Sequence, residues 1–79
     1  MKLRYKGSTF GPEGLTDNKV YICLGVEGPF VRIIDDSDED YLYSRRGPAP
    51  LEGTIPPGRW EIVEDDEKET LKKALTFDN

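Results

Sequence analysis

The sequence predicts a small all-β barrel followed by a short helix. Apolar residues alternate with a period of two in several short stretches, which is typical of half-buried strands. Clusters of Gly, Pro, Asn and Asp separate these stretches at close spacing, as in small barrels. A chain of 79 residues forms one domain at most. We therefore expect a five-stranded barrel over residues 1–64 and a helix with a tail over residues 65–79.

The predicted strands follow the apolar stretches in order. In the first, Leu3 and Tyr5 lie on one face, and the other face is basic. The second is apolar on both faces, with Ile22 and Leu24 opposite Tyr21, so we expect it to be covered on both sides. The five strands are predicted at residues 2–6, 19–26, 30–34, 41–43 and 59–64.

Polar and Gly/Pro segments connect these strands. Residues 17–18 form a predicted tight turn, residues 35–40 a predicted solvated, acidic hairpin tip, and residues 44–58 a long loop. The acidic turn does not fit a calcium-binding EF-hand loop. Counted from Asp36, Tyr41 stands at the sixth position, which requires glycine, and Gly47 at the twelfth, which requires glutamate.

A helix is predicted over residues 65–75. Acidic residues fill its expected first turn, and Lys72 and Lys73 its last, which suits the helix dipole. Its few apolar residues do not determine whether it packs against the barrel.

Composition excludes several classes of chemistry. The chain has no histidine, which removes Ser-His and Cys-His nucleophile pairs and most zinc sites. The single Cys23 lies in an apolar stretch and is expected to be a buried free thiol. No apolar stretch has the length of a membrane span, and no signal peptide is visible. We expect a cytoplasmic, monomeric protein that is not an enzyme and carries no cofactor or metal.

The sequence contains the short motifs Gly14-Leu15-Thr16, Lys19-Val20-Tyr21, Val31-Arg32-Ile33-Ile34-Asp35-Asp36-Ser37, Tyr41 and Trp60-Glu61-Ile62-Val63. These motifs resemble those of a group of small bacterial and phage-borne proteins with an SH3-like barrel. The resemblance covers roughly residues 1–64 and implies that fold, but no catalytic residues. Members of this group are mostly uncharacterised.

Asn18 and Asp38 depart from this pattern, because each stands where the pattern has glycine. Asn tolerates the left-handed backbone conformation, so little stability is lost at Asn18. Asp at position 38 is tolerated at a cost on the order of 1 kcal/mol relative to glycine. The connection between Tyr43 and Arg59 is also longer than the pattern has.

The candidate partner-binding residues are three aromatic side chains and two arginines. An exposed aromatic strip on such a barrel can bind an extended peptide, although Tyr41, Tyr43 and Trp60 can equally belong to the core. Arg45 and Arg46 precede the Pro-rich part of the 44–58 loop, which is a second candidate for contact with a partner. The first interpretation is therefore a non-enzymatic protein-interaction module.

The alternative is a small nucleic-acid-associated barrel. In that interpretation Lys2, Arg4, Lys6 and Arg32 contact phosphates, and the aromatic residues stack on bases. The net charge of −5 argues against it, because it repels a phosphate backbone.

Overall fold

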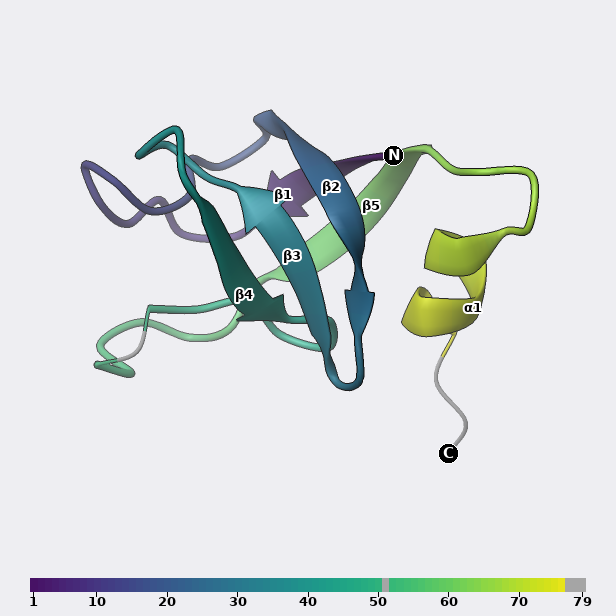
Figure 1. The fold of residues 1–79 in the computed structure, drawn as a ribbon. Coiled ribbons are helices and arrows are strands. Elements are labelled where there is room, and N and C mark those ends of the chain that lie inside the picture. Colours follow the sequence, from purple (N-terminus) through teal and green to yellow (C-terminus); the bar gives the residue numbers. More distant parts are fainter. Residues whose placement is uncertain (51, 77–79) are drawn as a thin grey trace.

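The computed structural model describes residues 1–50 and 52–76, which form one antiparallel sheet and a short C-terminal helix (Figure 1). Within these residues the mainly β composition and the number of strands are as predicted. The sheet has the order β4-β3-β2-β1-β5, so β4 and β5 are its two edge strands. The elements are β1 (Lys2–Lys6), β2 (Val20–Glu27), β3 (Phe30–Ile34), β4 (Asp40–Ser44), β5 (Arg59–Glu64) and α1 (Thr70–Leu75).

The core lies on one face of this sheet. Leu3 and Tyr5 of β1 are fully buried, and their partners on β5 are Ile62 and Trp60. The period of two in β1 thus selects the buried face as the sequence predicts. The buried apolar side chains are Leu3, Tyr5, Leu15, Tyr21, Cys23, Val31, Ile33, Trp60 and Leu71.

The expectation that β2 is covered on both faces is wrong. Tyr21 and Cys23 are buried, but Ile22 is 50% and Leu24 54% exposed on the other face. The register between β2 and β3 shifts at Leu24, which places two residues of β2 opposite Arg32. The apolar run therefore marks a strand with one buried face and an apolar outer surface, a distinction that periodicity alone cannot make.

The helix begins later than predicted. α1 starts at Thr70, and its first turn holds no acidic residue. Instead, the carboxylate of Asp65 accepts hydrogen bonds from the backbone N–H groups of Leu71 and Lys72 at 2.9 and 3.0 Å. The acidic residues thus precede the helix and satisfy its unpaired N–H groups from outside. Leu71 is fully buried, and α1 packs against β2 and β5.

The backbone at Asn18 and at Asp38, the two positions where the resembled pattern has glycine, is left-handed as expected. Asn18 has φ 69° and Asp38 has φ 65°, both in the left-handed region. Both side chains stand at exposed positions, so the turns tolerate them by local backbone geometry rather than by packing.

Replacement of Asp38 by glycine tests this turn. We expect Asp38→Gly to leave the melting temperature unchanged or raise it by up to about 4 °C, because relief of left-handed strain outweighs the added freedom of the unfolded chain. Differential scanning calorimetry measures the change. A decrease in the melting temperature of several degrees would mean that the Asp38 side chain itself stabilises the turn, by more than its left-handed backbone conformation costs.

Candidate functional site

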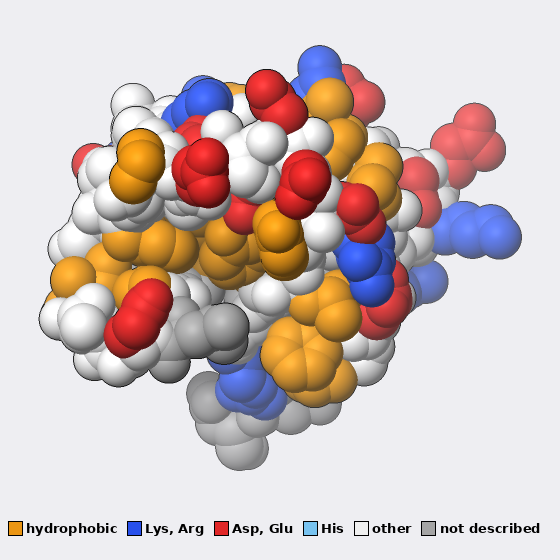
Figure 2. Space-filling view, turned by 60° about the vertical axis from the view of Figure 1, so that its left-hand side comes forward, with side chains coloured by type: hydrophobic (Ala, Val, Ile, Leu, Met, Phe, Trp, Pro, Cys, Tyr) orange, Lys and Arg blue, Asp and Glu red, His pale blue; other side chains and the backbone are white. Residues whose placement is uncertain are grey.

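A groove of about 650 Å³ lies beside β4. Figure 2 faces this side of the molecule, where hydrophobic side chains lie among Asp and Glu. The walls are the loop at residues 10–14, the end of β3 with the turn that follows it, β4, and part of the loop after β4. The described lining residues are Phe10, Gly11, Pro12, Glu13, Gly14, Asp35, Ser37, Tyr41, Leu42, Tyr43, Ala49, Pro50, Glu52 and Thr54.

Aromatic rings form the apolar part of the groove. The ring centroids of Phe10 and Tyr43 are 6.3 Å apart, and behind them Trp60 contacts both Tyr43 and Tyr5 in T-shaped arrangements. Tyr5 also contacts Phe10, at 5.9 Å, so the four rings form a closed set. Contacts of this type stabilise the arrangement of the rings by about 0.5–1.5 kcal/mol per pair beyond the burial of their area. The groove surface around Tyr43 and Phe10 is therefore formed before any partner arrives.

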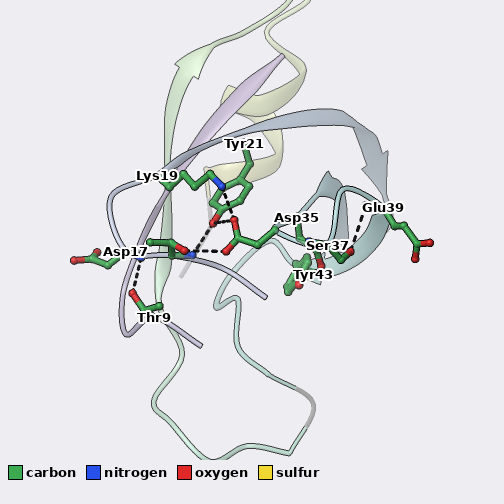
Figure 3. Close-up of polar contacts among 10 residues, drawn as sticks. Thr9, Asp17, Lys19, Tyr21, Asp35, Ser37, Glu39 and Tyr43 are labelled. Carbon is green, nitrogen blue, oxygen red and sulfur yellow. Dashed lines mark hydrogen bonds and ion pairs between the residues drawn. The ribbon is translucent and has the colours of Figure 1, made fainter. Parts of the chain in front are cut away.

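A buried carboxylate fixes Tyr43. Asp35 is only 5% exposed, and its Oδ2 accepts a hydrogen bond of 2.7 Å from the Tyr43 hydroxyl. Its Oδ1 accepts bonds from the backbone N–H and the hydroxyl of Ser37 (Figure 3). Burial, together with the bond to Asp35, raises the pKa of Tyr43 well above its ordinary value. Tyr43 is thus a neutral phenol at physiological pH, with its hydroxyl directed into the protein.

Tyr41 is the exposed aromatic residue of the groove. Its side chain is 50% exposed, and its hydroxyl donates a hydrogen bond of 3.0 Å to Glu39. This bond to a carboxylate raises the pKa of Tyr41. Tyr41 and Tyr43 pair with Ile33 and Val31, so both tyrosines lie on the inner side of the sheet. Half of the Tyr41 side chain is therefore accessible to a partner, and Tyr43 forms part of the groove floor.

The ionisable groups of the groove have one sign. Its described lining residues include Glu13, Asp35 and Glu52 and no Lys or Arg. A smaller hollow on the other side of Tyr41 adds Asp38, Glu39 and Asp40. Such a surface has a negative potential, which favours cationic ligands and opposes phosphates.

The structure distributes the predicted site residues over three places. Tyr41 and Tyr43 line the groove, whereas Trp60 is 8% exposed and donates its indole N–H to the Ser44 carbonyl oxygen at 3.0 Å. Arg45 donates a hydrogen bond to the carbonyl oxygen of Ala74 and so connects the loop to α1. Arg46 is exposed, and its backbone N–H donates to Ser44 Oγ at 3.2 Å.

The basic residues of the alternative interpretation lie apart from the groove. The register of β1 with β2 places Lys2 opposite the exposed Ile22, so the basic row belongs to the outer face. Arg32 also points outward, where it forms ion pairs with Glu27 and with Asp40, the latter at 2.9 Å. The cations and the groove aromatics are therefore not brought together on one surface.

Sequence reasoning missed Phe10, Glu13, Glu52 and the buried role of Asp35. The expectation of a solvated acidic turn is wrong for Asp35, which is buried, and for Asp36, whose side chain is 11% exposed. The sequence signal that could have identified Phe10 is that it is the one aromatic residue in the Gly/Pro-rich segment at residues 7–14. Phe10 pairs with Leu15 through two backbone hydrogen bonds of 2.9 and 3.0 Å, which fold this loop onto the core.

Residues 1–50 and 52–76 contain no group of three His, Cys, Asp or Glu side chains arranged to hold a metal ion. In the same part of the chain, no helix combines the length and the apolar character that a membrane crossing requires. Comparisons with protein-family models, with curated proteins and with solved structures found no match to this chain.

Proposed function

We propose that this chain is a non-enzymatic protein-interaction module of the SH3-like barrel type, and that it binds its partner in the groove beside β4. The observation that carries the proposal is the combination of an exposed ring, Tyr41, with an aromatic floor. Binding sites on protein surfaces are typically preformed, concave and aromatic, with a few polar groups that fix orientation. The position of β1 between β2 and β5 supports the barrel type, because it brings the first and last strands together.

The groove supports binding better than catalysis. Asp35 is the carboxylate buried beside it, and both of its oxygens already accept hydrogen bonds from Tyr43 or Ser37. Acid–base catalysis by paired carboxylates requires an environment that separates two pKa values. Glu13 and Glu52 are exposed and lack such an environment. The carboxylates are therefore better suited to select a partner by charge.

Affinity capture from a lysate of the source organism tests the proposal. We expect one protein to be retained by the wild type after nuclease treatment and lost with Tyr41→Ala, since truncation of an aromatic contact residue typically weakens binding by about 30-fold. Val63→Ala is the matched control, because Val63 is 46% exposed on β5, at the other edge of the sheet. Thermal unfolding first establishes that both variants are folded.

Two results would contradict the proposal. Equal recovery of the partner by Tyr41→Ala and the wild type would place the binding surface elsewhere. Recovery abolished by nuclease, with strong dependence on salt, would favour the nucleic-acid alternative.

A further inference from the structure

We infer that the partner segment is an extended, Lys- or Arg-containing peptide that pairs with the free edge of β4 as an additional strand. This inference rests on the proposed function and specifies the chemistry of its ligand. Two independent features of the described residues carry it: the backbone of the edge strand and the charge of the groove.

The backbone groups at the edge can be assigned from the ladder between β3 and β4. The backbone N–H of Arg45 donates to the carbonyl oxygen of Pro29 at 3.0 Å, and the backbone N–H of Asp35 donates to the carbonyl oxygen of Glu39 at 3.1 Å. In an antiparallel pair, alternate residues direct both backbone groups to the partner strand. Residues 39, 41, 43 and 45 therefore face β3, and the backbone N–H and C=O of Leu42 point away from it.

Within residues 1–50 and 52–76, no strand lies on that side of β4. The carbonyl oxygen of Ser44, at the end of the same edge, accepts the indole N–H of Trp60, so the core side chain ends the open stretch there. Leu42 is 41% exposed and also lines the groove. An extended chain placed along the groove can therefore donate to and accept from the Leu42 backbone, which is the pairing mode of strand addition.

The two edge strands differ in how they resist such pairing. Edge strands are usually protected by charged residues, proline or a bulge. β5 has three charged residues among its six, and its register with β1 shifts between Lys2 and Leu3. β4 has one, Asp40, and pairs with β3 without a shift. The edge at β4 is therefore the one suited to accept a strand.

The charge of the groove selects a cationic segment. Glu13 and Glu52 are exposed and line the groove from two different loops, and Glu39 accepts a hydrogen bond from the hydroxyl of the exposed Tyr41. A Lys or Arg side chain can lay its aliphatic part and its charge against the Tyr41 ring while it faces these carboxylates. A phosphate backbone has the opposite sign and is disfavoured at the same position.

Selection from a library of random eight-residue peptides displayed on phage tests the charge. The library is selected on the wild type at physiological salt and counter-selected on Tyr41→Ala. We expect the peptides that require Tyr41 to contain at least about twice the Lys and Arg fraction of the unselected library and to bind about fivefold more weakly to Glu13→Gln/Glu52→Gln. Selected peptides without this enrichment, or the absence of any peptide that requires Tyr41, would overturn the inference.

Backbone methylation of the best selected peptide tests strand pairing. N-methyl groups on alternate residues block the N–H groups on one side of an extended chain. One of the two alternating sets should weaken binding at least tenfold, and the other, with equal charge and methyl count, less than about twofold. Equal effects of the two sets would exclude strand addition. If capture of the natural partner requires Tyr41 but the selected peptides are not cationic, the proposed function stands and this inference fails.

Discussion

Replacement of Trp60 by alanine is expected to lower the free energy of unfolding by about 3–5 kcal/mol, which is most of the stability of a domain of this size. The indole is buried between the rings of Tyr5 and Tyr43 and donates its N–H to the carbonyl oxygen of Ser44. The substitution removes these contacts and leaves a cavity. Urea unfolding followed by far-ultraviolet circular dichroism measures the change without relying on tryptophan fluorescence.

Trp60→Phe is the matched control for this prediction. It retains a ring in the cluster and loses the hydrogen bond, so we expect a smaller loss of about 1–2 kcal/mol. Because Trp60 is not among the described residues that line the groove, Trp60→Phe should still capture the partner that Tyr41→Ala loses. An alanine variant within 1 kcal/mol of the wild type would remove Trp60 from the core and return it to the candidate binding surface.

The sequence predicted the strand pattern well because alternation is a local property of the chain. β1 and β3 coincide with their predicted ranges, and the left-handed turn at Asp38 followed from the intrinsic preferences of Asp. The predicted start of α1 at residue 65 is wrong, because acidic residues suit both the first turn of a helix and the segment that caps it.

The groove was only partly predictable because its walls are far apart in sequence. Tyr41 and Tyr43 were identified from an aromatic pattern within one strand. Phe10 and Glu52 reach the same groove through loops whose paths depend on long-range packing. Six consecutive polar residues indicate a solvated turn, and composition does not reveal that Asp35 and Asp36 point inward to tyrosine hydroxyls.

Asp36, in the turn after β3, connects this turn to the segment around Thr16 that leads into β2. We expect Asp36→Asn to be less stable than the wild type by an amount that depends on pH. Its carboxylate accepts hydrogen bonds from Thr16 Oγ1 at 2.8 Å, Lys19 Nζ at 2.7 Å and the Tyr21 hydroxyl at 3.0 Å. Figure 3 shows Lys19 and Tyr21 extending from the same strand region toward this turn. We expect Asp36→Asn to lose about 2 kcal/mol of unfolding free energy at pH 7, as for hydrogen bonds to a charged group.

The pH dependence follows from the pKa of Asp36. Burial raises this pKa, but the hydrogen bonds from Lys19, Thr16 and Tyr21 together lower it by more than burial raises it. The pKa of Asp36 therefore lies below the ordinary value of 3.8. A carboxyl group with a depressed folded pKa stabilises the protein above its unfolded pKa and loses that contribution as the pH falls through the folded value. The gap between wild type and Asp36→Asn should therefore be constant from pH 7 to about pH 5 and narrow below about pH 4.

Asp38→Asn makes the same chemical change two residues away and is the control for Asp36→Asn. Asp38 is exposed, and asparagine also tolerates its φ of 65°. We expect this variant to remain within about 0.5 kcal/mol of the wild type at every pH. Urea unfolding at pH 7, 5, 3.5 and 2.5 compares the three proteins. A gap for Asp36→Asn that is the same at all four values would mean that packing of the side chain, and not its charge, connects the turn to the Thr16 loop.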